Sequence, residues 1–236
     1  MPIQKFVSRV ATVEPVSRQC RVITLQLDSP RTINFKAGQH VIMDIPGIEA
    51  KRSYSIASTP KSTNAIELLI DIRPSGPGSR FLAATKPGDE ITFLAPAGQF
   101  WCEQWNPADH LIFIATGSGI CPLKSMITHV LSSEMQSKSI HLLWGLRHHN
   151  DIFWLEAFEQ LKKTCSNFSY DITLSKPSQD GPFLRGRVTD HLSTLTATTS
   201  SRQFYICGSK EMIVSVVEQL RETGIDSESI FFEKFY

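Results

Sequence analysis

The chain has 236 residues, of which 41% are hydrophobic and 20% are charged, a composition typical of globular proteins with one large or two small domains. Its formal net charge of +1 creates no overall field that would attract nucleic acid or an anionic membrane. The N-terminal segment lacks the apolar core of a signal peptide, and no apolar run is long enough to span a membrane. We therefore expect a cytoplasmic protein with no nucleic-acid or membrane partner.

The five cysteines are odd in number and widely spaced, which argues against a disulfide scaffold. None belongs to a Cys-x-x-Cys pair, and none shows the clustered spacing of a plant-type iron–sulfur site. The seven histidines form no pattern typical of a metal site either. We expect no metal and no iron–sulfur module, so redox chemistry would need an organic cofactor.

The first hundred residues consist of short β-branched segments separated by Gly and Pro turns. This pattern predicts a small antiparallel β-barrel or sandwich. A short helix is expected to begin near Gly78 and Ser79. The six expected strands cover residues 7–13, 21–27, 40–45, 52–57, 66–72 and 90–94.

The second half alternates strands that are apolar throughout with amphipathic helices. Such alternation predicts a doubly wound α/β domain, here with a five-stranded parallel sheet covered on both faces. We expect a first domain over residues 1–103 and a second over 109–236. The expected strands cover 111–115, 140–144, 168–174, 204–207 and 230–232, and the helices 122–135, 152–163, 188–195 and 210–223.

A glycine-rich turn, Thr-Gly-Ser-Gly, follows the first strand of the second half and precedes a helix. Gly117 and Gly119 would let a ligand approach the backbone, and free N–H groups at the helix start would favour a pyrophosphate. Pro122 suits a first helical turn. The pattern Gly-x-Gly-x-x-Pro differs from the Gly-x-Gly-x-x-Gly fingerprint, which disfavours an ordinary Rossmann dehydrogenase. A tight turn without a ligand is the alternative.

In the first half, the segment Arg52-Ser-Tyr-Ser55 lies on an expected strand, where alternation places Arg52 and Tyr54 on one face. Arg52 could bind a phosphate, Tyr54 could stack on a planar ring, and Ser55 could hydrogen-bond a ring nitrogen. The helix start at 76–79 is a second candidate anion site. Taken singly, an exposed Arg beside a half-buried Tyr and an ordinary capped turn explain both features.

Seven short motifs in this order resemble the ferredoxin–NADP reductase superfamily, especially NAD(P)H–flavin reductases and oxygenase reductase components without an iron–sulfur domain. The resemblance covers nearly the whole chain. The motifs are Arg52-Ser-Tyr-Ser55, 76–79, 116–122, Gly145-Leu-Arg147, Gly186-Arg-Val188, Tyr205-Ile-Cys-Gly208 and Glu233-Lys-Phe235.

The resemblance implies an FAD-binding barrel followed by an NAD(P)-binding domain, with NADH or NADPH as substrate. FMN in place of FAD stays open. Three residues would be catalytic: Ser55 near flavin N5, Cys207 against the nicotinamide and Glu233 in proton relay. The implied flavin-binding residues are Arg52, Ser53, Tyr54, Ser55, Ile70, Asp71, Ile72, Arg73, Gly78 and Ser79, with Phe235 or Tyr236 over the ring. The implied nucleotide-binding residues are Thr116, Gly117, Ser118, Gly119, Arg147, Ser175, Lys176, Cys207 and Gly208.

Several of these residues also have a purely structural interpretation: Cys207 as a buried thiol, Glu233 as a surface charge and Arg147 as a solvated loop charge. The function implied by the resemblance is an FAD-dependent oxidoreductase that passes electrons from NAD(P)H to a separate carrier. That carrier could be a ferredoxin, a flavodoxin or an oxygenase component. A reductase that releases reduced free flavin is the first alternative, and a non-catalytic electron-delivery or regulatory subunit is the second.

Overall fold

The computed structural model describes residues 2–47, 49, 51–73, 76–102, 108–132, 138–196 and 201–235, and of Phe235 only the backbone. The chain divides into two compact units, here called unit 1 (1–101 with 124–129) and unit 2 (102–123 with 130–236). The main division between the two units falls after residue 101. Among the described residues, no helix is both long enough and apolar enough to cross a membrane.

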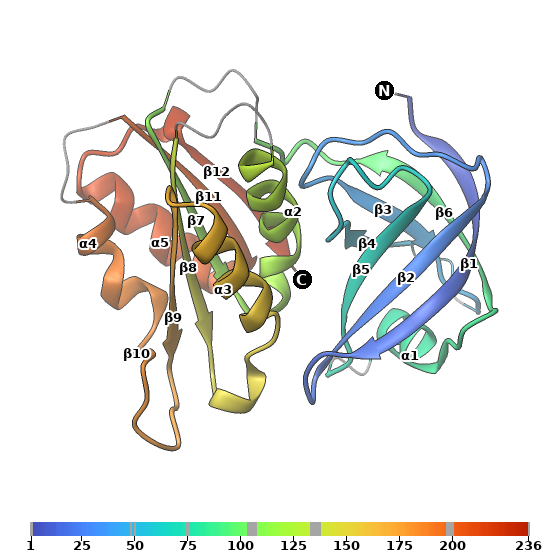
Figure 1. Cartoon of the computed structure of the whole chain (residues 1–236), viewed down its shortest axis with the longest axis horizontal. Helices are drawn as coiled ribbons and strands as arrows, with labels where there is room; N and C mark the ends of the chain where they lie inside the picture. The colour runs from blue at the N-terminus through green and yellow to red at the C-terminus, as the bar shows by residue number, and fades with distance from the viewer. Residues whose placement is uncertain are drawn as a thin grey trace. The chain divides into compact units, whose positions relative to one another are not determined.

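Unit 1 contains an antiparallel sheet with six strands in its described part, in the order β4-β3-β6-β1-β2-β5. Ile56, directly after β4, forms an antiparallel bridge with Leu68 of β5, so the two outer strands approach each other as in a barrel (Figure 1). The predicted antiparallel β-barrel is confirmed. Its elements are β1 (Gln4–Pro15), β2 (Cys20–Ser29), β3 (His40–Asp44), β4 (Lys51–Ser55), β5 (Ala65–Asp71), α1 (Pro77–Ala84) and β6 (Glu90–Ala97).

The core of unit 1 follows from the alternation of side chains along its strands. Val41 and Met43 of β3 are fully buried, whereas Ile42 between them is not. Phe6 of β1 stacks on Phe93 of β6 with ring centroids 5.4 Å apart. Burial of each such side chain stabilises the fold by roughly 1.5–3 kcal/mol, so these side chains hold together the sheet that carries β4.

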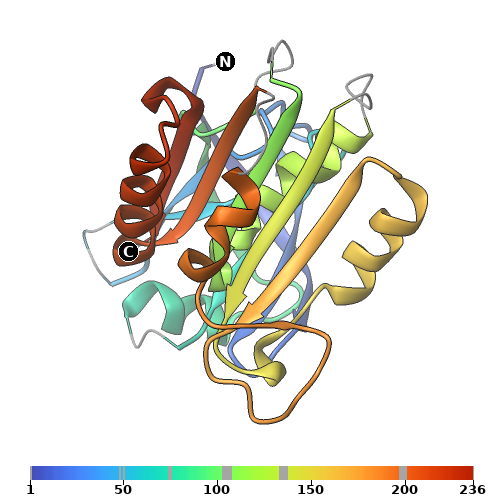
Figure 2. The ribbon, with the colours of Figure 1, turned by 90° about the vertical axis from the view of Figure 1, so that its left-hand side faces the viewer.

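Unit 2 contains a parallel sheet in the order β10-β9-β8-β7-β11-β12. Helices α2 and α3 lie on one face of this sheet, and α4 and α5 on the other (Figures 1 and 2). The strands are β7 (His110–Thr116), β8 (Ser139–Leu146), β9 (Phe168–Leu174), β10 (Leu184–Arg185), β11 (Arg202–Ser209) and β12 (Ile230–Phe235). The helices are α2 (Ile120–Leu131, of which 124–129 are counted with unit 1), α3 (Leu155–Thr164), α4 (Leu192–Thr196) and α5 (Lys210–Glu222), with 3-10 turns at Gly117–Gly119, His149–Asp151, Val188–His191 and Ser227–Ser229.

Coverage of both faces explains why the central strands are apolar throughout. In β7, the five residues between His110 and Thr116 are all buried. One face packs against α4 and α5 through Leu192, Ile213 and Leu220, which share a core with Ile114 of β7. The doubly wound parallel sheet is therefore confirmed as the architecture of the second half.

The structure differs from the sequence prediction in three details of unit 2. The sheet has a sixth strand in its described part, the two-residue β10, which is too short for any periodicity to reveal it. The helix expected at 188–195 is a 3-10 turn followed by the five-residue α4. The helix expected from 152 begins at Leu155, because Trp154 before it adopts a left-handed conformation with φ of 56°.

Candidate functional site

The candidate flavin-binding residues of unit 1 lie where β4 meets the start of α1. A side-chain carbon placed on Gly78, in the first turn of α1, would lie 2.5 Å from the Tyr54 hydroxyl oxygen and 3.1 Å from Cγ of Arg52. Only glycine fits there without a shift. Arg52 and Tyr54 therefore project toward the same helix start, as strand alternation predicts.

The start of α1 is suited to an anion. Gly76 is the N-cap residue and provides no side-chain hydrogen bond to the first turn, and Pro77 occupies one of the first two helical positions. The first N–H groups of a helix lack partners within the helix and carry partial positive charge. With the Arg52 side-chain stem packed against Gly78, they form a cradle whose chemistry fits the pyrophosphate of a dinucleotide.

Tyr54 is half-buried, and burial raises the pKa of its phenol while the Arg52 charge opposes that rise. The phenol is therefore neutral at physiological pH and can stack on a planar ring. Arg52 is exposed and donates one hydrogen bond of 2.9 Å to the Lys51 carbonyl. Ser53 is exposed, whereas Ser55 at the end of β4 is only 5% exposed.

The second group of candidate flavin residues lies at the end of β5. Ile70 is buried in the barrel core, and Ile72 packs against that core. Asp71 accepts hydrogen bonds from the Arg73 guanidinium, whose Nε lies 3.0 Å and 3.1 Å from its two carboxylate oxygens. The pair holds Arg73 at the strand end, so the positive charge there is largely balanced by Asp71.

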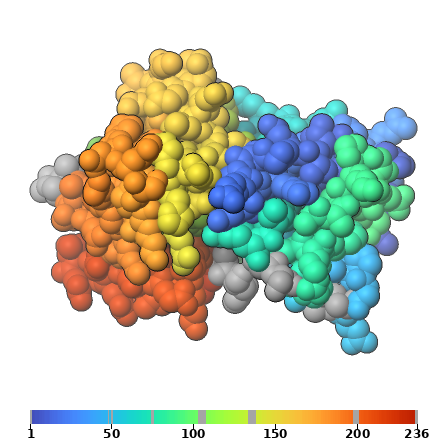
Figure 3. Space-filling model, turned by 90° about the horizontal axis from the view of Figure 1, so that it is seen from below, coloured from blue at the N-terminus to red at the C-terminus, as the bar shows by residue number. Residues whose placement is uncertain are grey.

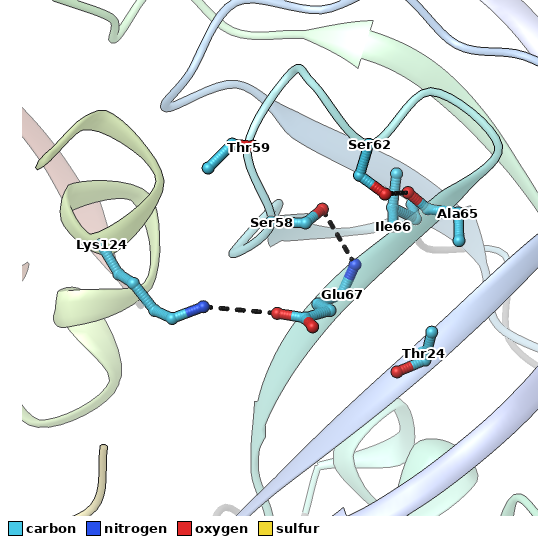
Figure 4. Close-up of a pocket in the computed structure, with 8 residues that line it drawn as sticks. All are labelled: Thr24, Ser58, Thr59, Ser62, Ala65, Ile66, Glu67 and Lys124. Carbon is cyan, nitrogen blue, oxygen red and sulfur yellow. Dashed lines mark hydrogen bonds and ion pairs between the residues drawn. The ribbon is translucent and has the colours of Figure 1, made fainter. Parts of the chain in front are cut away.

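A separate pocket of about 290 Å³ lies in unit 1, lined by eight residues of which none is a sequence-predicted site residue (Figure 4). Glu67, in the wall of the pocket, forms an ion pair with Lys124 at 3.3 Å, and the Glu67 backbone N–H donates to the Ser58 hydroxyl at 3.1 Å. These polar groups satisfy one another, and the volume is below the range typical of small-molecule sites. We assign no ligand to it. The lining residues are Thr24, Ser58, Thr59, Ser62, Ala65, Ile66, Glu67 and Lys124.

In unit 2, the candidate nucleotide turn connects β7 to α2 through a 3-10 turn at Gly117–Gly119. Gly117 has φ of +54°, a left-handed conformation that favours glycine. Thr116, Gly117 and Ser118 are partly exposed, so a ligand can reach the turn. No acidic residue lies in the first turn of α2, which leaves the positive helix end available to a phosphate.

Close backbone approaches surround this turn at the carboxyl edge of the sheet. A side-chain carbon on Gly119 would overlap the Cys207 carbonyl oxygen and lie 2.8 Å from Cα of Gly208. A side-chain carbon on Gly145, at the end of β8, would lie 2.8 Å from Val188 and 3.1 Å from Thr116. The segments that sequence analysis singled out at the strand ends are therefore packed together by small residues.

Cys207 lies on β11 beside Glu233 of β12 and is fully buried. Burial raises the pKa of its thiol well above the ordinary value, and the nearby Glu233 and Cys121 add to that rise. The thiol is therefore protonated at physiological pH and is a poor nucleophile. Glu233 is half-buried.

The loops after β8 and β9 lie side by side, as the yellow and orange segments show in Figure 3. The Lys176 N–H donates to the Arg147 carbonyl at 2.8 Å, and the Ser175 N–H to the Leu146 carbonyl at 3.0 Å. Arg147, Ser175 and Lys176 are all exposed. Two positive side chains therefore share one rim of the carboxyl edge of the sheet.

Sequence reasoning missed Trp144 near these loops, and it included Arg187 in the motif Gly186-Arg-Val188 without giving it a role. Trp144 of β8 donates its indole N–H to the Gly117 carbonyl at 3.0 Å, but an aromatic residue in an apolar strand reads only as core. Arg187 follows Gly186, whose N–H donates to the Leu174 carbonyl at 3.0 Å, so it adds a third cation to the same edge.

Two predictions on the chain end fall partly outside the structure. Tyr236 lies outside the described residues, and of Phe235 only the backbone of β12 is described, paired with Ser209. Their stacking on a flavin stays a prediction. Within the described ranges, no three His, Cys, Asp or Glu side chains gather as the ligands of a metal would.

Two family models match the chain, one for each half. Residues 8–101 match the oxidoreductase FAD-binding domain, and residues 113–218 match the oxidoreductase NAD-binding domain. The candidate flavin site lies within the match to the FAD-binding domain, and the candidate nucleotide site lies within the match to the NAD-binding domain. The chain end after residue 218 lies outside both matches. The chain is thus a flavoprotein oxidoreductase with FAD and NAD(P) as its cofactors.

Similar proteins narrow the class further. The chain is 30% identical over 241 residues to ferredoxin–NADP reductase B of Sorangium cellulosum, covering 98% of each protein. It is 29% identical over 242 residues to the reductase component of propane 2-monooxygenase of Rhodococcus jostii, covering 100% of the chain but 65% of that relative. Thus the chain spans about two thirds of the length of this relative. It belongs to the ferredoxin–NADP reductase superfamily.

Solved structures show the same fold. The cytochrome P450 reductase GcoB of Amycolatopsis superposes with a TM-score of 0.91 at 24% identity, over 99% of this chain and 70% of that one. A ferredoxin–NADP⁺ reductase of Neisseria gonorrhoeae with bound FAD and NADP superposes with a TM-score of 0.85 at 19% identity, over the whole of both chains.

Proposed function

We propose that this protein takes a hydride from a reduced nicotinamide nucleotide and passes the electrons through FAD to a separate ferredoxin-type or flavodoxin-type carrier. FAD supplies the redox chemistry, because it accepts two electrons as a hydride and can release them singly. The observation that carries the proposal is the presence of two differently built cradles, one in each unit, whose chemistry suits these two ligands. The names of the relatives, a ferredoxin–NADP reductase and an oxygenase reductase component, support a protein acceptor.

The residues of unit 1 have binding and orienting roles in this proposal. Arg52 and the first N–H groups of α1 bind the pyrophosphate, and Tyr54 packs on the flavin or its ribityl chain. Ser55 positions the flavin ring and offers a hydroxyl to flavin N5. Residues 70–73, at the end of β5, line the flavin or its ribityl chain. These groups accelerate the reaction by orientation, since no protein nucleophile is required.

The residues of unit 2 position the nucleotide. Its pyrophosphate binds at the turn formed by Thr116, Gly117, Ser118 and Gly119. Gly208, which has no side chain, lets the main chain of this turn lie close to β11. The neutral thiol of Cys207 packs against the nicotinamide. Glu233, adjacent to Cys207 across β11 and β12, serves as the acidic group in proton relay.

We further propose NADPH as the preferred donor. Among the described residues, Arg147, Lys176 and Arg187 form no ion pair with an acidic side chain. The acid in the loop after β8, Asp151, accepts the His148 N–H at 3.0 Å and is 9% exposed, so it is used as a cap. In doubly wound folds a strand-end acid binds the ribose 2′-hydroxyl of NAD, whereas a nearby Arg accommodates the 2′-phosphate of NADP.

The first experiment is anaerobic reduction of the protein with one equivalent of FAD, by NADPH and separately by NADH, followed through the visible flavin band. Rapid bleaching by NADPH supports the proposal, and absence of bleaching by either nucleotide would leave a non-catalytic subunit. Gel filtration after reduction then separates the two catalytic readings: FAD that stays bound fits electron transfer to a carrier, and released FAD fits a flavin reductase.

A second experiment tests the nucleotide preference. Lys176→Ala should raise the KM for NADPH by about tenfold or more, because a charge-assisted hydrogen bond is worth roughly 1.5–3 kcal/mol. The KM for NADH should not change. Lys163→Ala is the matched control, since Lys163 is an exposed lysine of α3 in the same unit. Equal effects of Lys176→Ala on both nucleotides would contradict the role in binding the 2′-phosphate.

A further inference from the structure

Trp144 links the core of unit 2 to the nucleotide turn. Its side chain is fully buried on β8, and its indole N–H donates to the Gly117 carbonyl at 3.0 Å. A buried indole N–H needs an acceptor, since leaving it unpaired costs on the order of 1–3 kcal/mol. The acceptor that Trp144 uses is part of the turn that binds the nucleotide.

The indole itself packs within an aromatic cluster. Phe153 packs edge-on against it with ring centroids 4.8 Å apart, and Phe158 of α3 packs at 6.1 Å. Both phenylalanines are buried. The Trp144 ring is therefore fixed by core packing as well as by its hydrogen bond to the turn.

The Gly117 carbonyl accepts two donors, the Trp144 indole and the Ile120 backbone N–H. The peptide bond after Gly117 is trans, so the N–H of Ser118 points away from the carbonyl of Gly117. A carbonyl held toward the buried indole consequently directs the Ser118 N–H to the opposite side. Ser118 is partly exposed, so a ligand can reach this residue.

We infer that Trp144 is a positioning residue for the nucleotide pyrophosphate: it orients the Gly117–Ser118 peptide so that the Ser118 N–H is available to a phosphate oxygen. The inference rests on the proposed function, in which this turn receives the nucleotide. A glycine with positive φ can adopt several backbone conformations, so the indole hydrogen bond selects one orientation before the ligand arrives. Such preorganisation increases affinity by reducing the entropy lost on binding.

The test is Trp144→Phe, which retains an aromatic ring and removes the donor, assayed with two hydride donors. With NADPH the KM should rise roughly 3- to 10-fold, as expected for one net hydrogen bond, while kcat stays within about twofold. Dihydronicotinamide riboside carries the reducing ring but no phosphate, so its rate should not change. Trp154→Phe is the matched control, because Trp154 lies one ring further along the cluster, 5.1 Å from Phe153, and should leave both donors unaffected.

Two outcomes would overturn the inference. Equal losses with both donors would show that Trp144 only supports the fold, and an unchanged KM for NADPH would show that the turn needs no such bond. If Trp144→Phe does not fold, Trp144→benzothienylalanine replaces the N–H by sulfur with both fused rings kept, and the same split between donors must appear. Wild-type protein that fails to oxidise NADPH would instead refute the proposed function, which distinguishes the two failures.

Discussion

The two candidate sites differ in what builds them. In unit 1 the site consists of side chains, Arg52 and Tyr54, gathered at the start of α1 around one glycine, Gly78. In unit 2 it consists largely of backbone, where Gly119 lies against the main chain of Cys207 and Gly208. A side chain can rotate to accommodate a new atom, whereas a strand in the middle of a sheet cannot move without breaking its ladder. The unit 2 site should therefore tolerate much less change.

Gly119→Ala tests this difference at its strongest point. The added methyl would overlap the Cys207 carbonyl oxygen and lie 2.6 Å from its carbonyl carbon. Because β11 cannot yield, we expect a loss of about 3 kcal/mol in the free energy of unfolding, with loss of NADPH binding. Urea unfolding and the KM for NADPH measure the two effects. Gly181→Ala, which has open space around the new atom, should show neither, and a small loss for Gly119→Ala would remove the contrast between the units.

Gly78→Ala should have a smaller effect that can be rescued. The new methyl would lie 2.5 Å from the Tyr54 hydroxyl, at the end of a side chain that can shift. We expect a loss of about 1–2 kcal/mol and weaker FAD retention in gel filtration. Tyr54→Phe in the same protein removes the clashing oxygen and should recover most of the loss.

Gly76→Ala is the control for Gly78→Ala, because Gly76 precedes α1 and has open space around it. A double variant, Gly78→Ala with Tyr54→Phe, as unstable as Gly78→Ala alone would show that the contact with Arg52 dominates. The unit 1 site would then be as rigid as the unit 2 site.

The neutral thiol of Cys207 makes a prediction about reactivity. Since the thiolate is the nucleophile and burial raises the pKa of this thiol, iodoacetamide at pH 8 should modify Cys207 far more slowly than Cys102 and Cys165, which are half-buried. Peptide mass spectrometry over time gives the order of reaction. In urea, all five cysteines should react alike, and early alkylation of Cys207 in the folded protein would contradict a buried, protonated thiol.

The smallest effect concerns His141, away from both sites. Burial lowers the pKa of its imidazole, and Asp171, with an oxygen 3.4 Å from Nε2, partly offsets this. The unfolded chain therefore binds a proton near the ordinary pKa of 6.5 before the folded protein does, so stability falls as pH decreases below about 6.5.

His141→Gln should flatten this dependence between pH 6.5 and 5 in urea unfolding. His129, whose pKa burial also lowers, is present in both proteins, so the difference between the two curves isolates His141. A steeper slope in the variant would mean that the Asp171 charge outweighs the burial of His141.

The architecture could be predicted because its signals are local. Alternation in β3 and apolar continuity in β7 follow from which faces of a strand are covered, and Gly117 and Gly119 mark the turn by their composition. The two-residue β10 could not be predicted, since it exists only through its pairing with Thr173 and Leu174. The 3-10 turn before α4 was missed because its apolar spacing is shared by both helix types at that length.

Local pattern and motif order in the sequence by themselves determined the two-domain architecture and the residue types at each cradle, because strand and helix periods and glycine turns are properties of neighbouring residues. Only the tertiary structure decided that Gly78 lies against Tyr54, that Cys207 is buried and neutral beside Glu233, and that Trp144 donates to the Gly117 carbonyl. These facts join residues 24 or more positions apart in the chain. Their energies depend on burial and distance, which exist only once the sheet and barrel have closed.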